Sequence, residues 1–326
     1  MDTKILRGIL LLLLTISAVG KSHASCGSAS CPLNSHQPLR AGWIHATLTH
    51  ETINQDRIAA GSLPLFVGAL SNERDEEQTL NQRSVLGMQY SISEAMALTI
   101  ELPFILRTHS HIDEGRNVSF NLRGLGDIVV GGVFSLLSPP EEFDRSLSVQ
   151  VGAKLPTGVT DGTGSNGEVA EVTIQPGTGS FDGIVGLDYR QGLARASSLS
   201  GEFSIVPLTA GVSYQVSGRG THGYRLGNTL LVYLGSEYRL LGQVTVLMQA
   251  NGMFRAHSDA GSTGESPQNT GGAEIFLSPG VKLHLSSAFS VFGYVQVPVY
   301  VNVQGIQQTS RVGMQFGASA DLDLFP

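Results

Sequence analysis

The stretch from Tyr224 to Ala256, YRLGNTLLVYLGSEYRLLGQVTVLMQANGMFRA, alternates apolar and polar residues in two runs separated by Leu241 and Gly242. The apolar parity of the first run holds Leu226, Leu230, Val232, Leu234 and Tyr238. The polar parity holds Arg225, Thr229, Tyr233, Glu237 and Arg239. Such alternation predicts β-strands with one apolar face and one polar face. Both runs exceed the about five or six residues usual in soluble sheets and reach the roughly 9 to 11 that a tilted strand needs to cross a bilayer.

The composition of the chain favours a membrane barrel. Charged residues make up 14% of the 326 residues, against roughly 25% in soluble domains. No uninterrupted apolar run reaches the about 18 residues of a spanning helix, whereas a barrel carries its apolar surface on alternate residues. The net charge of -7 argues against binding to nucleic acid or to anionic lipid.

The first 24 residues have the organisation of a secretory signal peptide. Lys4 and Arg7 precede the mostly aliphatic segment 8–19, and small residues lead to Ala24. We expect cleavage after Ala24 and export of the rest of the chain. Retention as a membrane anchor is one alternative, although the apolar segment is short for a span. Lipoprotein processing at Cys26 is another, although no Leu stands three residues before it.

The only cysteines, Cys26 and Cys31, lie in the segment 25–41, which we expect to be an irregular periplasmic leader. In an oxidising periplasm a small disulfide loop is the expected state of this pair. Free thiols remain an alternative. A metal site is a further one, but His36 is the only additional ligand nearby.

Twelve segments carry an apolar parity and are predicted to be the strands of one barrel, residues 42–326. They lie near 42–50, 80–93, 95–107, 123–137, 145–156, 180–191, 198–212, 223–240, 242–257, 273–286, 288–302 and 308–325. The fold class is therefore an all-β transmembrane antiparallel up-and-down β-barrel of about 12 strands.

The connections between these segments alternate in length. Short links are predicted at 93–95, 138–144, 192–197, 241–242 and 286–288. Long polar links are predicted near 51–79, 108–122, 157–179, 213–222, 258–272 and 302–308. Outer-membrane barrels have short periplasmic turns and longer outer loops, so this order fits an even number of strands with both chain ends inside.

Aromatic residues are placed to form the two girdles of such a barrel. Tyr224 and Tyr238 share a parity near opposite ends of one predicted strand, where girdle residues lie. Further candidates are Phe104, Phe254, Phe289 and Phe325. The barrel assembly machinery reads a terminal aromatic residue in many outer-membrane barrels, and here Phe325 is followed by Pro326.

Three glycine-rich motifs follow one another along the chain: GLGDI at 124–128, AKLPTG at 153–158 and GTGSFD at 177–182. In order and spacing they resemble the outer-membrane family named for the meta-pathway of phenol degradation, over most of the mature chain. The resemblance implies a barrel of the outer membrane that moves small, often aromatic, molecules, and it does not imply catalysis. The leader with the two cysteines has no place in that pattern.

The residues of these motifs are expected to be structural. Gly124 and Gly126 share the lipid-side parity, where a small residue allows a bend or bulge. Lys154 and Asp182 are expected to face inward on adjoining strands and to pair across the wall.

The polar parities predict the residues that line the lumen. The basic candidates are Arg83, Arg107, Arg123, Lys154, Arg190, Arg225, Arg239, Arg255, Lys282 and Arg311. The acidic candidates are Glu101, Asp127, Asp182, Asp188, Glu202, Glu237, Glu274, Asp321 and Asp323. Rings of charge set ion selectivity in channels, but a nearly balanced set also suits salt bridges that fill a narrow barrel. Both alternatives stay open.

No enzyme is expected, and the candidates for chemistry are weak. His257 and Ser258 stand side by side at a strand end, but neighbours on a strand point to opposite faces and cannot readily form a base and nucleophile pair. The loop 157–179 holds oxygen ligands but lacks a recognised calcium repeat, so we expect an outer loop and no cofactor. Its ligand candidates are Asp161, Asn166, Glu168 and Glu171.

The sequence thus predicts a channel in the outer membrane of a Gram-negative-type cell that passes small solutes, with aromatic or hydrophobic compounds as candidates. The expected partners are outer-membrane lipid, the barrel assembly machinery and the solute. A closed structural or interaction barrel, with residues 25–41 in or beneath the lumen, is the alternative from another class. An outer-membrane lipid hydrolase that uses Ser258 is a third.

Overall fold

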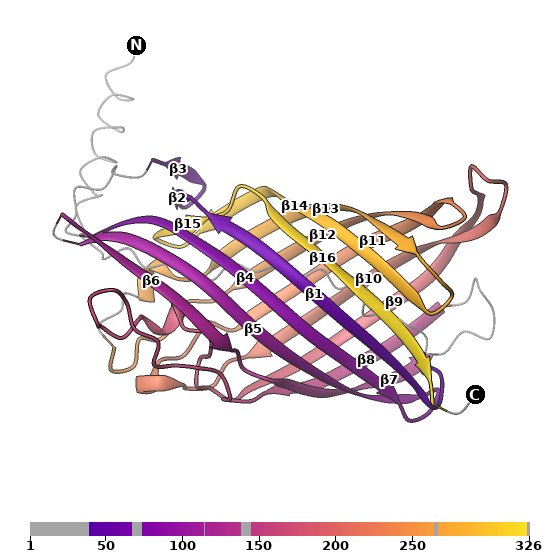
Figure 1. Cartoon of the computed structure of the whole chain (residues 1–326), viewed down its shortest axis with the longest axis horizontal. Helices are drawn as coiled ribbons and strands as arrows, with labels where there is room; N and C mark the ends of the chain where they lie inside the picture. The colour runs from indigo at the N-terminus through magenta and orange to yellow at the C-terminus, as the bar shows by residue number, and fades with distance from the viewer. Residues whose placement is uncertain (1–38, 67–73, 114, 138–144, 264–266, 325–326) are drawn as a thin grey trace, which may run out of the picture.

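The computed structural model describes residues 39–66, 74–113, 115–137, 145–263 and 267–324 (Figure 1). The predicted signal peptide, the Cys26 and Cys31 pair and the terminal Phe325 lie outside these ranges. No helix in the described ranges has the length and apolar character needed to cross a membrane.

Strands dominate the described chain. The first half holds β1 (Trp43–Gln55), β2 (Arg57–Ala60), β3 (Leu63–Leu65), β4 (Arg74–Ser91), β5 (Met96–Asp113), β6 (Arg116–Leu125), β7 (Val129–Leu137) and β8 (Arg145–Lys154). The second half holds β9 (Asp182–Ser197), β10 (Phe203–Val216), β11 (Thr229–Leu241), β12 (Val244–Arg255), β13 (Gly272–His284), β14 (Phe289–Val303), β15 (Ile306–Thr309) and β16 (Gly313–Asp323). Three short 3-10 turns lie in loops: η2 (Val172–Ile174), η3 (Thr221–Gly223) and η4 (Pro267–Asn269).

One 13-stranded antiparallel sheet closes on itself into a wall of 12 strand positions, because β6 and β7 share one position along β5. Each strand of this sheet pairs with the next strand of the sheet along the chain, except that β6 does not pair with β7. β16 closes the ring against β1, with Trp43 opposite Asp323. The predicted all-β antiparallel barrel is therefore confirmed. A separate three-stranded sheet, in the order β15, β2, β3, lies at one end of it (Figure 1).

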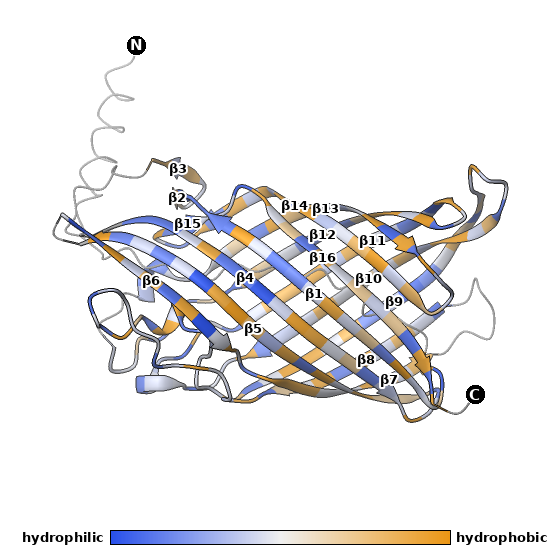
Figure 2. Ribbon diagram, in the orientation of Figure 1, coloured by the Kyte–Doolittle hydropathy of each residue, from blue (hydrophilic) through white to orange (hydrophobic). Residues whose placement is uncertain are grey.

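The two faces of the wall differ in polarity, as the alternation predicts. Apolar residues alternate with polar ones along the strands (Figure 2). Leu48 is 56% exposed, Met248 53% and Leu234 52%, so large apolar side chains stand outward on several strands. Directly opposed residues on neighbouring strands share a face. The register therefore places the opposite parity, which includes the buried Gln249 and Ser278, toward the lumen.

The connections sort by length between the two ends of the barrel. Within the described ranges, one end carries the short turns 92–95, 198–202, 242–243 and 285–288. The other end carries the long connections 155–181, 217–228 and 256–271 and the small sheet. Two predicted links are wrong: residues 192–197 belong to β9, and 108–122 form the ends of the β5–β6 hairpin. Polar residues continue these strands beyond the apolar belt, so composition alone suggested loops.

The wall is irregular where β6 passes into β7. Leu125 lies opposite Phe104 and Val129 opposite Glu101, so three residues on one strand face two on β5. One extra residue is a β-bulge, and it reverses the side-chain parity. Arg123 therefore lies opposite Leu106 on the outward face, and Gly124 lies opposite Ile105 on the inward face. The predicted inward Arg123 and lipid-side Gly124 are both wrong for this reason.

Tyr224 departs from its predicted girdle position. It is 2% exposed and follows η3 in a loop, because β11 begins only at Thr229. Phe104, Phe254 and Phe289 stand outward as expected, with exposures of 42%, 39% and 40%.

Candidate functional site

Most of the predicted lumen residues lie on inward faces of the wall. By register, the basic ones are Arg83, Arg107, Lys154, Arg190, Arg239, Arg255 and Lys282. The acidic ones are Glu101, Asp182, Asp188, Glu237, Glu274, Asp321 and Asp323. Asp127 lies in the bulge after β6 and turns to Lys154.

Three further candidates lie beyond the ends of the barrel strands, so their predicted place in the lumen is wrong. Glu202 is exposed in the turn before β10, and its backbone N–H donates to the Ser198 hydroxyl at 3.0 Å. Arg225 lies in the long connection between β10 and β11, bridged by its backbone to Asp259. Arg311 precedes β16 and pairs with Asp56 at 3.2 Å. In each case the alternation extends past the last residue of the ladder.

The three glycine-rich motifs converge on one buried ion cluster. The Lys154 ammonium lies 2.7 Å from an Asp182 carboxylate oxygen and 3.3 Å from one of Asp127. It also donates to the hydroxyls of Thr178 and Ser180. Asp182 is 0% exposed, Asp127 7% and Lys154 9%. Paired and hydrogen-bonded charges of this kind can be buried, whereas an isolated one is costly.

Asp127 joins two ends of the long loop 155–181 to the wall. One of its carboxylate oxygens accepts from the backbone N–H of Gly158 at 2.9 Å, and the other from the backbone N–H of Thr178 at 2.8 Å. Gly158 and Gly177 pass each other so closely that a Cβ on Gly177 would lie 2.6 Å from the Gly158 Cα. Only glycine permits this crossing. Asp127, Gly158 and Gly177 therefore fasten the two ends of the loop to the wall, and we call this arrangement the clasp.

The same loop covers a break in the strand ladder. β7 pairs with β8, but β6 pairs only with β5, so its second edge has no strand partner within the described chain. Single bonds from the loop replace a ladder there: the Val159 N–H donates to the Leu125 carbonyl at 3.0 Å, and the Ser165 N–H donates to that of Ser119 at 2.9 Å.

An apolar cluster holds the loop against the inner side of β6. It consists of Phe120, Leu122, Ala170 and Ile174. The guanidinium of Arg107, on β5, donates hydrogen bonds to the carbonyls of Thr173 at 3.2 Å and Gln175 at 3.3 Å. The loop is therefore a folded-in part of the wall, held by charge, hydrogen bonds and apolar contact.

The lumen wall also carries uncharged polar groups. Buried inward amides and hydroxyls extend over β12 to β16, namely Gln249, Asn251, Ser278, Gln296 and Gln315. The Asn251 amide donates to the Ser278 hydroxyl at 3.0 Å. Neutral hydrogen-bonding groups thus stand beside charged ones here, because Arg255, Glu274 and Lys282 also face inward on β12 and β13.

The predicted lumen charges include both ion-paired side chains and side chains without an ion pair. Glu101 lies 3.9 Å from Arg83, and Glu237 lies 3.4 Å from Arg190, so these four are paired. Lys282 is 8% exposed and forms no ion pair with any described residue. The lumen combines internal salt bridges with at least one unpaired inward cation in the described chain.

Sequence reasoning missed a buried pair of histidines on β5. His109 and His111 both face inward on β5. The His109 Nδ1 lies 2.8 Å from the Thr79 hydroxyl. Its Nε2 lies 3.3 Å from a carboxylate oxygen of Glu76. The i, i+2 spacing of the two histidines is the available signal in the sequence, but the polar composition of this segment predicts a loop.

The residues considered for hydrolysis and for calcium binding make other contacts. The His257 Nδ1 lies 3.3 Å from the Pro267 carbonyl, whereas the Ser258 hydroxyl accepts from the Gly227 N–H at 3.3 Å. In the loop 155–181 the Asn166 amide donates to Glu168 at 2.8 Å. No group of three or more His, Cys, Asp or Glu within the described ranges is arranged to hold a metal ion.

Comparison with known proteins supports the fold. No protein-family model matches the sequence, and no curated protein matches it. The chain is similar to the structure of an outer membrane channel from Pseudomonas putida F1, with a TM-score of 0.57, 12% identity and coverage of 92% of this chain and 100% of that one. The transport unit of the autotransporter AIDA-I from Escherichia coli gives a TM-score of 0.48 at 10% identity, over 89% and 93% of the two chains. At these identities the likeness concerns the fold alone.

Proposed function

We propose that this chain is an outer-membrane channel through which small solutes, above all hydrophobic or aromatic ones, cross by diffusion. The observation that carries the proposal is the closed wall of 12 strand positions with exposed apolar side chains outside and charged or polar ones inside. A soluble protein rarely exposes apolar patches beyond a few hundred Å², whereas a barrel in lipid requires such a belt.

The distribution of loops supports an outer-membrane orientation. Short turns collect at the end that holds both Trp43 and Asp323, and the long connections collect at the other (Figure 1). This is the arrangement of bacterial outer-membrane barrels, with the short turns in the periplasm. The predicted signal peptide and the barrel assembly machinery provide the route to that membrane.

Two observations favour hydrophobic cargo. The glycine-rich motifs resemble a family associated with small aromatic molecules. The break beside β6 is sealed by a loop with an apolar inner cluster of Phe120, Leu122 and Ile174 rather than by a strand ladder. The similar channel from Pseudomonas putida F1 adds the precedent of a barrel of this fold that serves as a channel.

The membrane placement is tested first. Purified chain in detergent should migrate differently on a gel before and after boiling, because a folded barrel binds less denaturant than the unfolded chain. Identical migration, together with elution as a soluble protein without detergent, would refute a membrane barrel.

Transport is tested on the same sample. Single-channel recordings in planar bilayers should show discrete conductance steps. Cells that express the protein should take up a labelled monoaromatic hydrocarbon faster than cells that lack it, with a disaccharide as the comparison solute. A folded sample that conducts nothing and does not speed uptake would favour the alternative, a closed structural barrel, for which the ion cluster and paired lumen charges are the motivating observation.

A further inference from the structure

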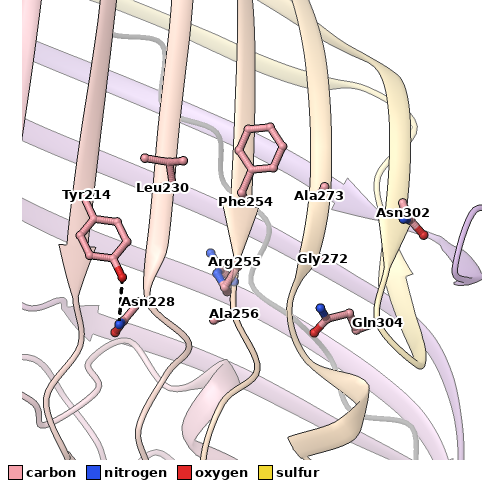
Figure 3. A pocket seen from close by; sticks show the side chains of 10 residues that line it. All are labelled: Tyr214, Asn228, Leu230, Phe254, Arg255, Ala256, Gly272, Ala273, Asn302 and Gln304. Carbon is pink, nitrogen blue, oxygen red and sulfur yellow. Dashed lines mark hydrogen bonds between the residues drawn. The ribbon is translucent and has the colours of Figure 1, made fainter.

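A hollow of about 440 Å³ lies near the long-loop ends of β10 to β14 (Figure 3). One row of directly opposed residues crosses it: Tyr214, Leu230, Phe254, Ala273 and Asn302. Leu230 and Phe254 belong to the outward parity of the β11–β12 hairpin, so the whole row faces away from the lumen. The hollow therefore opens on the outside of the barrel.

The floor of the hollow exists because one residue of the row is small. Ala273 stands between Phe254 and Asn302. The neighbouring lining residues Gly272 and Ala256 are small as well. The larger Phe254 and Leu230 form an apolar wall on one side (Figure 3).

Two margins of the hollow carry hydrogen-bonding groups without charge. The Asn228 amide donates to the Tyr214 hydroxyl at 3.1 Å. Asn302 and Gln304 are exposed, and their side chains lie on the other margin (Figure 3). Arg255 also borders the hollow, but its guanidinium turns to Thr229 at 3.4 Å and to the Met253 sulfur at 3.6 Å. Both of those residues are on the inward parity, so no charge is directed into the hollow.

We propose that this hollow binds a glycolipid of the outer leaflet, with one acyl chain against Leu230 and Phe254 and the sugar hydroxyls or acyl amide against Asn302 and Gln304. The proposal rests on the outer-membrane placement given above. Its position, where the apolar belt meets the long-loop end, is the depth at which acyl chains join headgroups. Its volume lies within the range of small-molecule sites.

The lack of charge selects the occupant. A phospholipid is held by its phosphate, for which proteins provide Arg or Lys donors. The hollow has side-chain amides and a phenol instead, and these groups pair with hydroxyls and amides. A bare fatty chain would make no hydrogen bond to Asn302 or Gln304, so the sugar-bearing lipid is the best match.

The experiment measures lipid binding to the purified full-length barrel by native mass spectrometry. The probes are a long-chain N-acylglucosamine, the fatty acid of the same chain length, and phosphatidylglycerol. The N-acylglucosamine should bind about tenfold more tightly than the fatty acid, as expected from one or two added net hydrogen bonds.

Two variants on the lipid-facing side give the matched comparison. Ala273→Leu fills the floor and should weaken N-acylglucosamine binding about tenfold, because the leucine takes the space of roughly two buried methylene groups. Ala250→Leu is the control, since Ala250 lies outward on β12 between Leu234 and Leu277, away from the hollow. Its binding should equal that of the wild type.

Each outcome decides one of the two proposals. Equal binding of all three probes, or unchanged binding in Ala273→Leu, overturns the glycolipid site and leaves the channel proposal standing. A wild type that fails the boiling shift overturns the membrane placement itself. A wild type that shifts on boiling and binds the glycolipid but conducts nothing refutes transport and retains the site.

Discussion

At the scale of single residues, the chain uses its few charges in two different settings. Lys154 is 9% exposed between two carboxylates inside the wall, whereas the side chains of Arg219 and Asp259 are 59% and 40% exposed in outer loops. Both are close ion pairs, at 2.7 Å. Their energetic roles differ, because removing one partner of a buried pair leaves the other charge uncompensated.

Replacing Lys154 with Met should lower the free energy of unfolding by about 3 to 5 kcal/mol, because Asp127 and Asp182 then remain buried without a cation. The measurement is denaturant unfolding in detergent or lipid. Arg219→Ala breaks the matched exposed pair and should lower the free energy of unfolding far less than the Lys154 variant does. Equal losses in the two variants would contradict the structural role of the buried cluster.

Asp259 should report the geometry of the outer loops through its titration. A hydrogen bond from the Gly261 backbone and then the Arg219 guanidinium hold the pKa of Asp259 below its ordinary value of 3.8. These interactions therefore stabilise the loops fully above the ordinary pKa and are lost as pH falls through the lower folded value. A ¹³C carboxyl titration should show a midpoint below 3.8, and Arg219→Gln should raise it. An unchanged midpoint in that variant would show that the pair does not form.

At the scale of elements, the folded-in loop 155–181 depends on a crossing of two glycines. A Cβ on Gly158 would lie 2.6 Å from the Gly177 Cα and 2.9 Å from the Asp127 backbone nitrogen. A methyl group there displaces the backbone segments that Asp127 holds. The clasp and the break beside β6 are consequently one structural unit.

Gly158→Ala should loosen this loop, at a cost of roughly 1 to 3 kcal/mol for overpacking. Cleavage by a glutamate-specific protease at Glu168 should become faster in the variant. Gly183→Ala is the control, since a Cβ at Gly183 meets nothing within 4 Å. If Gly158→Ala and the wild type are cut at the same rate, the crossing does not secure the loop.

The elements also show what alternation along the chain can predict. The two runs in 224–256 fold as β11 and β12 with the predicted inner turn at Gly242, because polarity and register have the same period of two. The pairing of Lys154 with Asp182 was likewise predictable from parity on neighbouring strands. Strand ends are predicted less accurately, since polar residues that continue a ladder beyond the apolar belt resemble loop residues.

Other features of the site cannot be predicted from the alternation of apolar and polar residues. The bulge at 126–128 adds one residue and turns Arg123 outward, although the alternation of apolar and polar residues in the sequence does not change there. Tyr224 has the parity of a girdle residue but is buried beside η3. Thr178 and Ser180 reach Lys154 only because the loop folds back, which is a contact between distant segments.

At the scale of the whole molecule, the lumen combines ion-paired side chains with an inward cation, Lys282, that has no ion pair among the described residues. In the proposed channel the paired charges largely neutralise one another, so an inward cation without an ion pair has more influence on passing ions than the paired ones. Lys282 is such a cation, opposite Phe292 on the inner face of β13.

Lys282→Gln should therefore shift ion selectivity toward cations, measured as the reversal potential across a planar bilayer with a salt gradient. Arg123→Gln removes the same charge from the outward face and should leave that potential unchanged. An equal shift in both variants would mean that the overall field of the protein, rather than the lumen lining, sets selectivity.

The seam between β1 and β16 has a consequence for how the chain reaches this state. Trp43 and Asp323 face each other across the seam, so the ring cannot close until both ends of the barrel sequence are present. Neighbouring strands form local hairpins, which are fast to assemble, but the seam carries nearly the largest loop-closure entropy available to the chain. Until it closes, β1 and β16 expose unpaired edges that invite pairing with other chains. Closure of this seam is thus the expected slow step of folding, and the point at which a chaperone or an assembly catalyst has most to contribute.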